Sequence, residues 1–183
     1  MKFFSLFSVA RCRSLSIAAM VLGALLASCS EPSPPARVAA IKPDDPLVTI
    51  AAIRAAGEKD DSVIQVAPLR DPAVEGFLAE AHGAETQRKF DAEAAALERA
   101  LKLAPDAPDI LQLLAEAEIA RGNVRRAEEL AMKSFAAGPR LGALCARNWQ
   151  TLVETRTVLN DPVTRKQAEQ RVKDCRKNGP VRM

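Results

Sequence analysis

The sequence predicts an all-α protein in which three helical hairpins stack as an α-solenoid behind a cleaved signal peptide and a flexible linker. Three observations support this prediction. Alanine is abundant while glycine contributes only 8 of the 183 residues, and this balance favours helices. From residue 71 onward, apolar residues recur at helical spacing. The pattern then repeats after about 34 residues, a length typical of helical-hairpin repeats.

Residues 1–28 have the parts of a secretory signal peptide. Lys2, Arg11 and Arg13 form a basic leader, and the fifteen residues between Arg13 and Cys29 carry no charge. That run is short for a membrane-spanning helix, which needs roughly 17–25 apolar residues. We therefore expect residues 1–28 to be removed on export.

The segment Leu26-Ala27-Ser28-Cys29 resembles the lipobox of bacterial lipoproteins. The resemblance implies that Cys29 becomes a lipidated N-terminus, and two or more acyl chains hold a soluble domain durably at a bilayer. In Gram-negative lipoproteins an Asp after the cysteine commonly causes retention in the inner membrane. Ser30 therefore implies the periplasmic side of the outer membrane. The alternatives are an ordinary signal peptide with an incidental cysteine, and a short membrane anchor.

The mature chain is expected to be formally neutral. The leader holds 3 of the 26 Lys and Arg residues and none of the 23 Asp and Glu residues, which leaves 23 of each sign. Nucleic-acid binding depends on a basic surface, so this balance argues against nucleic acid as the main partner. Aromatic residues make up only 4% of the chain, with no Tyr, so stacking platforms for single strands are missing too.

Residues 29–70 are predicted to form the lipidated N-terminus and a flexible, proline-rich linker. Within residues 47–70, the run LVTIAAIRAAGEKDD could form a short helix. The sequence leaves open whether this segment docks along the domain, docks onto a partner, or is only tether. As a flexible coil, these roughly forty residues would span about 35 Å on average. Fully stretched, they could reach about 130 Å.

Residues 71–177 are predicted to form the helical repeat domain, followed by a tail at residues 178–183. Asp71 and Pro72 have the character of an N-cap and a first-turn proline. Small and apolar residues then follow at helical spacing at Phe77, Ala81 and Ala84. A second helix begins near residue 90 and ends near residue 105.

A second hairpin matches the first at a shift of about 34 residues. The aligned pairs are Phe77 with Leu111, Ala81 with Ala115, Phe90 with Val124, Ala100 with Ser134, Leu101 with Phe135, and Pro105 with Pro139. This pattern resembles the tetratricopeptide repeat (TPR). The second copy fits that family through Leu111, Leu114, Ala115, Gly122, Ala127 and Pro139. The first copy departs from it at Glu80, Arg88 and Glu93, where the family prefers Leu, Gly and Ala. The alternative is another hairpin array packed through alanine.

A third hairpin is predicted at residues 141–177, because at least three hairpins are normally needed to close a repeat stack. Cys145 and Cys175 lie almost symmetrically about its turn at residue 160. Both would fall at the same end of the hairpin, which in an exported protein predicts a disulfide. Closing a loop of about thirty residues would stabilise the fold by roughly 3–4 kcal/mol. Two cysteines without a nearby histidine form an incomplete zinc site, so no metal is expected.

We find no catalytic constellation in the sequence, and so predict neither an enzyme nor a cofactor. His82 is the only histidine, and no Gly-rich phosphate loop, GxSxG or HExxH motif occurs. The carboxylates are scattered along amphipathic helices, as solvated faces usually are. Binding is the function class that the sequence favours.

The TPR resemblance implies a concave binding groove lined by the first helix of each hairpin. Carried over by position, the lining comprises Glu75, Leu78, His82 and Glu85 from the first copy and Asp109, Gln112, Glu116 and Ile119 from the second. Such a groove is acidic with apolar spots and suits a basic or mixed partner segment. The alternative is that these are ordinary polar positions of exposed helices.

A second candidate is the segment around Trp149. We expect Trp149 to fill the core between the last two hairpins. Its neighbours Arg147 and Asn148 would either satisfy backbone groups or face the groove.

The expected function is that of an adaptor or regulator in cell-envelope biogenesis, with a periplasmic or envelope protein as partner and no small-molecule substrate. The layout resembles LpoP-type activators of bifunctional peptidoglycan synthases, which implies a penicillin-binding protein as the partner. A long tether would let such a domain reach an enzyme in the other membrane. The alternatives are an assembly factor for outer-membrane proteins or type IV pili, an adaptor for a periplasmic protease, and a structural envelope lipoprotein.

Overall fold

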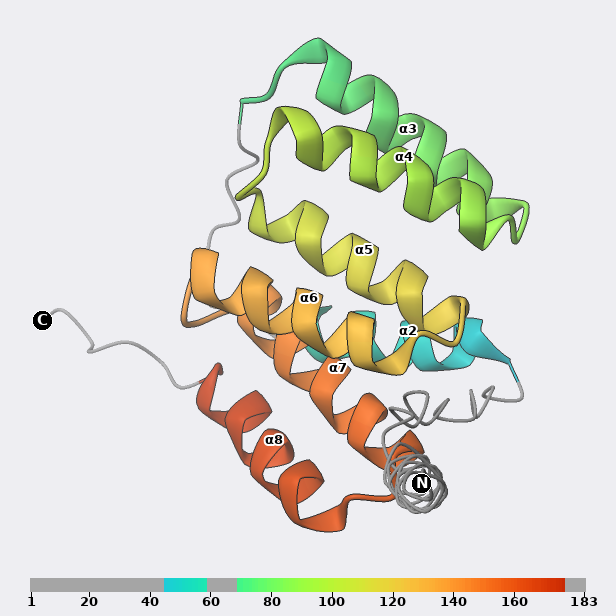
Figure 1. Ribbon diagram of the computed structural model, residues 1–183. Helices are drawn as coiled ribbons and strands as arrows, with labels where there is room; N and C mark the ends of the chain where they lie inside the picture. Colours follow the sequence, from blue (N-terminus) through green and yellow to red (C-terminus); the bar gives the residue numbers. More distant parts are fainter. Residues whose placement is uncertain (1–44, 59–68, 177–183) are drawn as a thin grey trace, which may run out of the picture. The chain divides into compact units, whose positions relative to one another are not determined.

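The computed structural model describes residues 45–58 and 69–176. Within these ranges all regular elements are helices, which confirms the predicted all-α fold (Figure 1). They are α2 (Pro46–Glu58), α3 (Pro72–Thr86), α4 (Phe90–Leu103), α5 (Pro108–Ala120), α6 (Val124–Ala137), α7 (Ala143–Val158) and α8 (Pro162–Asp174). The predicted signal peptide, Cys29 and the predicted tail lie outside the described residues.

Six of these helices form three hairpins, α3–α4, α5–α6 and α7–α8. Neighbouring hairpins pack through α4 against α5 and through α6 against α7, which produces the predicted solenoid (Figure 1). Asp71, as the sequence predicts, and Asp161 each cap the first turn of a helix. The Asp71 side chain accepts a hydrogen bond from the Ala73 N–H at 2.7 Å, and that of Asp161 accepts one from the Thr164 N–H at 3.0 Å. Each satisfies an amide that the first helical turn would leave unpaired.

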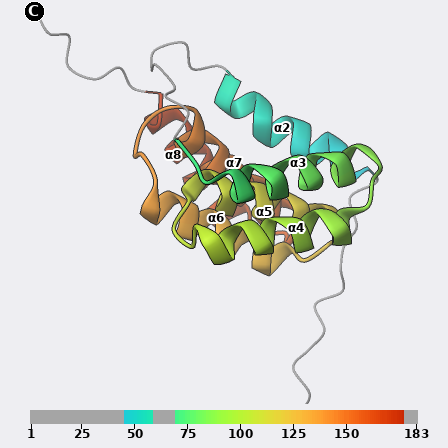
Figure 2. The same ribbon diagram turned by 90° about the horizontal axis from the view of Figure 1, so that it is seen from above.

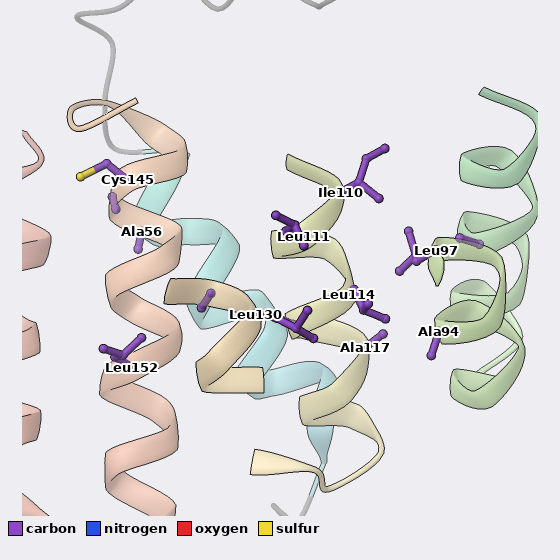
Figure 3. Close-up of a cluster of buried hydrophobic side chains, with 14 of the residues drawn as sticks. Ala56, Ala94, Leu97, Ile110, Leu111, Leu114, Ala117, Leu130, Cys145 and Leu152 are labelled. Atoms are coloured by element: carbon purple, nitrogen blue, oxygen red, sulfur yellow. The ribbon is translucent and has the colours of Figure 1, made fainter. Parts of the chain in front are cut away.

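The core is built from leucine and alanine, and Figure 3 shows the larger side chains on α4, α5, α6 and α7. Leu97, Leu111 and Leu114 are almost fully buried. Burying one such side chain contributes roughly 1.5–3 kcal/mol. Alanines at the helix contacts are equally buried, and their small volume lets the helices approach closely. Ser134, the counterpart of Ala100 in the next repeat, is also buried, and its hydroxyl donates to the Pro108 carbonyl at 2.6 Å.

The last hairpin is closed by a disulfide between Cys145 and Cys175, with an S–S distance of 2.02 Å and a Cα–Cα distance of 5.6 Å. The bond joins the beginning of α7 to the end of α8. Trp149 of α7 lies edge-on to Phe135 of α6, with ring centroids 5.1 Å apart. The Arg171 guanidinium lies 5.7 Å from the centre of the Trp149 ring. Trp149 therefore lies between the last two hairpins as expected, but it is only partly buried and packs against the core rather than filling it.

The helix α2 corrects the predicted domain boundary. Residues 29–70 were expected to be linker, but α2 packs against α5 and α7, within the helical domain (Figure 2). Ile50, Ile53 and Ala56 form the buried face of α2 because they recur at helical spacing. The helical part of this segment, α2, therefore docks along the domain, one of the possibilities that the sequence left open.

Candidate partner-binding surface

The predicted groove residues lie on α3 and α5, the first helices of the first two hairpins. On α3, Glu75 and His82 are exposed, while Leu78 and Glu85 are partly buried. On α5, Asp109 is partly buried, whereas Gln112, Glu116 and Ile119 are buried, with exposed fractions of 0%, 0% and 5%. The prediction of an open lining is therefore wrong for these last three residues.

The helix α2 covers this part of the surface. Arg54 of α2 donates from Nε to Glu116 Oε2 at 2.8 Å, and its Nη1 lies 2.7 Å from Glu85 Oε1. Ile53 packs with Ile119 in a small apolar cluster. The surface that was expected to hold a partner segment thus holds a helix of the same chain.

Arginines of the segment 45–70 pair with every acidic residue of the predicted lining. Arg54 bridges Glu85 and Glu116, as described above. Arg70 forms an ion pair with Asp109 and lies 3.7 Å from Glu75. The acidic groove was predicted to suit a basic or mixed segment, and in this structure the chain supplies that segment itself.

Glu116 is the centre of a buried polar network between α2, α5 and α7. Arg147 of α7 approaches Glu116 Oε1 with Nε at 3.1 Å and Nη2 at 2.5 Å. Gln112 donates to the same oxygen at 3.0 Å and to the Thr151 hydroxyl at 2.9 Å. Arg147 therefore faces the predicted groove, one of the two roles expected for it. Asn148 is buried, and its side-chain amide has no hydrogen-bond partner among the described residues.

The charge of Arg54 is matched to this environment. Burial acts to lower the pKa of Arg54, but the carboxylates of Glu116 and Glu85 outweigh that effect and raise the pKa above its ordinary value. The surface therefore favours the positive charge of this guanidinium, despite its partial burial. A neutral side chain in its place would leave Glu116, which is fully buried, with Arg147 as its ion-pair partner among the described residues.

Glu93 adds a third carboxylate to this region. It lies on α4, is 3% exposed, and its Oε2 has no hydrogen-bond partner among the described residues. Burial raises the pKa of Glu93 to about 7, assisted by Glu85 and Glu116 and opposed by Arg54. The sequence had marked residue 93 as a departure from the repeat pattern, but had not connected it with the groove.

The described residues hold no group of three or more His, Cys, Asp and Glu side chains arranged to bind a metal ion. Among the same residues, no helix is long and apolar enough to cross a membrane. A cleft elsewhere on the domain is lined by residues of α4, α5 and α6, including Leu101, Leu111, Leu114 and Leu130. Its rim mixes acidic and basic side chains, so it offers no charge signature comparable to that beneath α2.

The described residues therefore form a solenoid of helical hairpins whose predicted groove is covered by α2. Among solved structures, the chain is similar to the globular C-terminal domain of P. aeruginosa LpoP. The TM-score is 0.53 and the sequence identity 29%, and the match covers 57% of this chain and 99% of that domain. This likeness supports an LpoP-like fold for the helical domain. No protein-family model and no curated protein matches the chain.

Proposed function

We propose that this chain is an outer-membrane lipoprotein whose helical domain binds and activates a bifunctional peptidoglycan synthase in the periplasm. The observation that supports this best is the 29% identity to the LpoP C-terminal domain across 99% of that domain. The predicted layout supports the same role, because a segment with the pattern of a signal peptide, a lipobox-like Cys29 and a proline-rich stretch precede the helical domain in the sequence. The proposed role is regulatory rather than enzymatic.

The anchor in this proposal is a lipid on Cys29, placed after a signal peptide at residues 1–28. Because α2 is docked, only about sixteen residues separate Cys29 from Asp45, where the helical domain now begins. At full extension they span at most about 55 Å. The reach from the membrane is therefore much shorter than a tether ending at residue 70 would allow.

The direct test of the proposal is reconstitution with the bifunctional synthase of the same cell and its lipid-linked precursor. We expect the mature chain to increase glycan polymerisation and crosslinking several-fold. If the chain binds the synthase but leaves its rate unchanged, the synthase is a binding partner and the activating role is wrong. Absence of both binding and activation contradicts the proposal.

The choice among the alternative partners can be made by crosslinking in living cells. A photoreactive residue at His82 or Glu75, both exposed on α3, should capture the synthase. The same residue at Lys166, exposed on α8, is the matched control and should capture less. Capture of a pilus secretin or of a periplasmic protease at His82 would instead support one of the other adaptor roles.

Membrane anchoring has its own test. Replacing Cys29 by Ala should release the chain from the membrane fraction, whereas Cys12→Ala, within the leader, should not. A processed Cys29→Ala protein that stays membrane-bound would show that another feature anchors it.

A further inference from the structure

The helix α2 is held in place by the surface beneath it. It has 13 residues, and isolated helices of that length are marginal in water. Its apolar contribution comes mainly from Ile50, Ile53 and Ala56, while Val48, Ala51 and Ala52 face solvent. A helix with one narrow apolar face and a solvated opposite face is stable only while it remains docked.

The surface under α2 is unusually polar for a permanent interior contact. Gln112, Glu116, Arg147 and Thr151 meet there, and Glu116 relies on arginines from two other helices. Gln112 Oε1 and Glu93 Oε2 have no hydrogen-bond partner among the described residues. Burying polar groups costs free energy, which is recovered only where they are well paired. When α2 is released, the polar groups of this surface can bind water again. The docking of α2 is therefore stabilised by less free energy than an apolar contact of equal size would provide.

The same surface has a defined specificity. Glu85 and Glu116 both form ion pairs with Arg54, and Glu93 interacts with it electrostatically, so this surface selects a cationic side chain. Close to it, a Cβ added at Gly57 would lie 3.1 Å from the Ala143 carbonyl oxygen and 3.1 Å from Arg147 Cγ. This surface therefore favours a helix with two isoleucine-like residues, one basic residue and, three positions after the basic residue, a small residue such as glycine.

From these observations we infer that α2 is a displaceable occupant of a helix-binding surface. The segment that replaces it is an amphipathic helix of a protein partner, with Arg or Lys at the position of Arg54. The partner's identity as a synthase rests on the function proposed above, whereas the displacement of α2 does not. When α2 leaves, the chain before α3 lengthens the tether from the membrane, so partner binding and reach increase together.

Hydrogen exchange of the unmodified mature chain tests whether α2 opens on its own. We expect amides of α2 to exchange at least about tenfold faster than the most protected amides of α5 and α7. If all three helices exchange at one common rate, α2 opens only when the whole domain unfolds, and the inference is overturned. This measurement needs no variant and no partner.

A charge-reversal pair then tests the role of Arg54. Arg54→Glu places a carboxylate among Glu85, Glu93 and Glu116, so exchange in α2 should rise a further tenfold or more while α7 stays protected. Arg126→Glu makes the same charge change on the exposed face of α6 and should leave α2 unchanged. Unfolding of the whole domain by Arg54→Glu, or equal exchange in both variants, would contradict a separately docked helix.

Competition is measured as the affinity of the two variants for the synthase. If the partner takes the place of α2, Arg54→Glu should bind at least about threefold more tightly than Arg126→Glu, because the competing helix is gone. Equal or weaker binding overturns the competition even when the synthase role holds. If the wild-type chain does not bind the synthase at all, the proposed function fails, and the exchange data still decide whether α2 is displaceable.

Discussion

The first hairpin, α3–α4, and the second, α5–α6, follow the same repeat pattern but are buried to very different degrees. Ten of the 13 residues of α5 are buried, whereas only three of the 15 residues of α3 are. The reason is position, because α5 lies between α4, α6, α7 and α2, while α3 packs mainly against α4. A repeat pattern therefore specifies a hairpin, and the neighbours specify which of its positions matter.

Two of the three departures of the first copy illustrate this difference. Glu80 stands where the second copy has Leu114, but the Glu80 position is exposed and its carboxylate pairs with Arg99. Glu93 stands where the second copy has Ala127, and both residues are buried. The first substitution is thus neutral for the fold, whereas the second places an acid in the interior beside the surface that α2 covers.

The largest effect on stability is expected from substitutions at Leu114 and Glu80, the equivalent positions of the two hairpins. Leu114→Ala should lower the free energy of unfolding by about 2–5 kcal/mol, because it leaves a cavity in a packed core. Glu80→Ala, at the equivalent position, should change it by less than about 0.5 kcal/mol. Chemical denaturation of both variants is the measurement. Similar losses at the two positions would mean that the hairpins are equally buried in solution.

The disulfide gives the next largest effect and acts on the third hairpin. Replacing Cys145 and Cys175 together by Ala should cost roughly 3 kcal/mol of unfolding free energy, since the cross-link restricts the unfolded chain. Amides of α8 should lose the most protection from hydrogen exchange, and those of α3 the least. A loss spread evenly over all hairpins would instead indicate a single cooperative unit without a weaker end.

The pH dependence of stability tests the buried acid of the first copy. The pKa of Glu93 is raised from 4.5 to about 7, so between these values the folded state binds more protons than the unfolded state. The free energy of unfolding must therefore fall as the pH rises from 4.5 to 7 and level off above 7. Glu93→Gln removes this slope and should be more stable than wild type at pH 8, by up to about 3 kcal/mol.

The matched control for Glu93 is Glu98→Gln, an exposed acid on the same helix. Urea denaturation of the wild type and both variants at pH 5 and pH 8 provides the comparison. The stability gain of Glu93→Gln over wild type, measured as free energy of unfolding, should be larger at pH 8 than at pH 5. The corresponding difference between Glu98→Gln and wild type should be the same at both pH values. A constant difference for both would place Glu93 in a solvated environment.

The hairpins could be predicted from sequence because their signals are local. Asp71 and Asp161 cap helices within a few residues, and the repeat period is visible along the chain. The docking of α2, by contrast, depends on contacts between residues far apart in the sequence. Arg54 and Glu116 are 62 positions apart, and the proline-rich residues before α2 are equally typical of a linker. Ile50 and Ile53 already had helical spacing, but that spacing does not say which surface they cover.

For the candidate site, the sequence correctly predicted the acidic character of the lining but not that α2 covers part of it. The acidic character of the groove followed from Glu85 and Glu116, and it is present. Arg54 and Arg70 were missed, because opposite charges far apart in sequence could pair with any of many partners. The excess of acidic residues in the predicted lining was the available signal, since a buried carboxylate requires a cation nearby.

The smallest expected effect concerns the two turns. Arg88 and Gly122 occupy equivalent positions, and both have positive φ, 56° and 81°. This conformation suits glycine and costs other residues about 1 kcal/mol. Arg88→Gly should therefore stabilise the first hairpin by about 0.5–1 kcal/mol, and Gly122→Ala should destabilise the second by about 1 kcal/mol.

One contact complicates the first turn, because Arg88 also forms an ion pair with Asp45, with Nη2 and Oδ2 3.2 Å apart. Both side chains are exposed, so the pair contributes little, about 0–1 kcal/mol. In an Asp45→Asn background, neither the parent nor its Arg88→Gly variant can form this ion pair. Thermal denaturation of these two proteins should therefore show the full stabilisation by glycine at residue 88. If Arg88→Gly destabilises the domain even in that background, the positive φ at residue 88 is not a cost, and the turns of the two hairpins are equivalent after all.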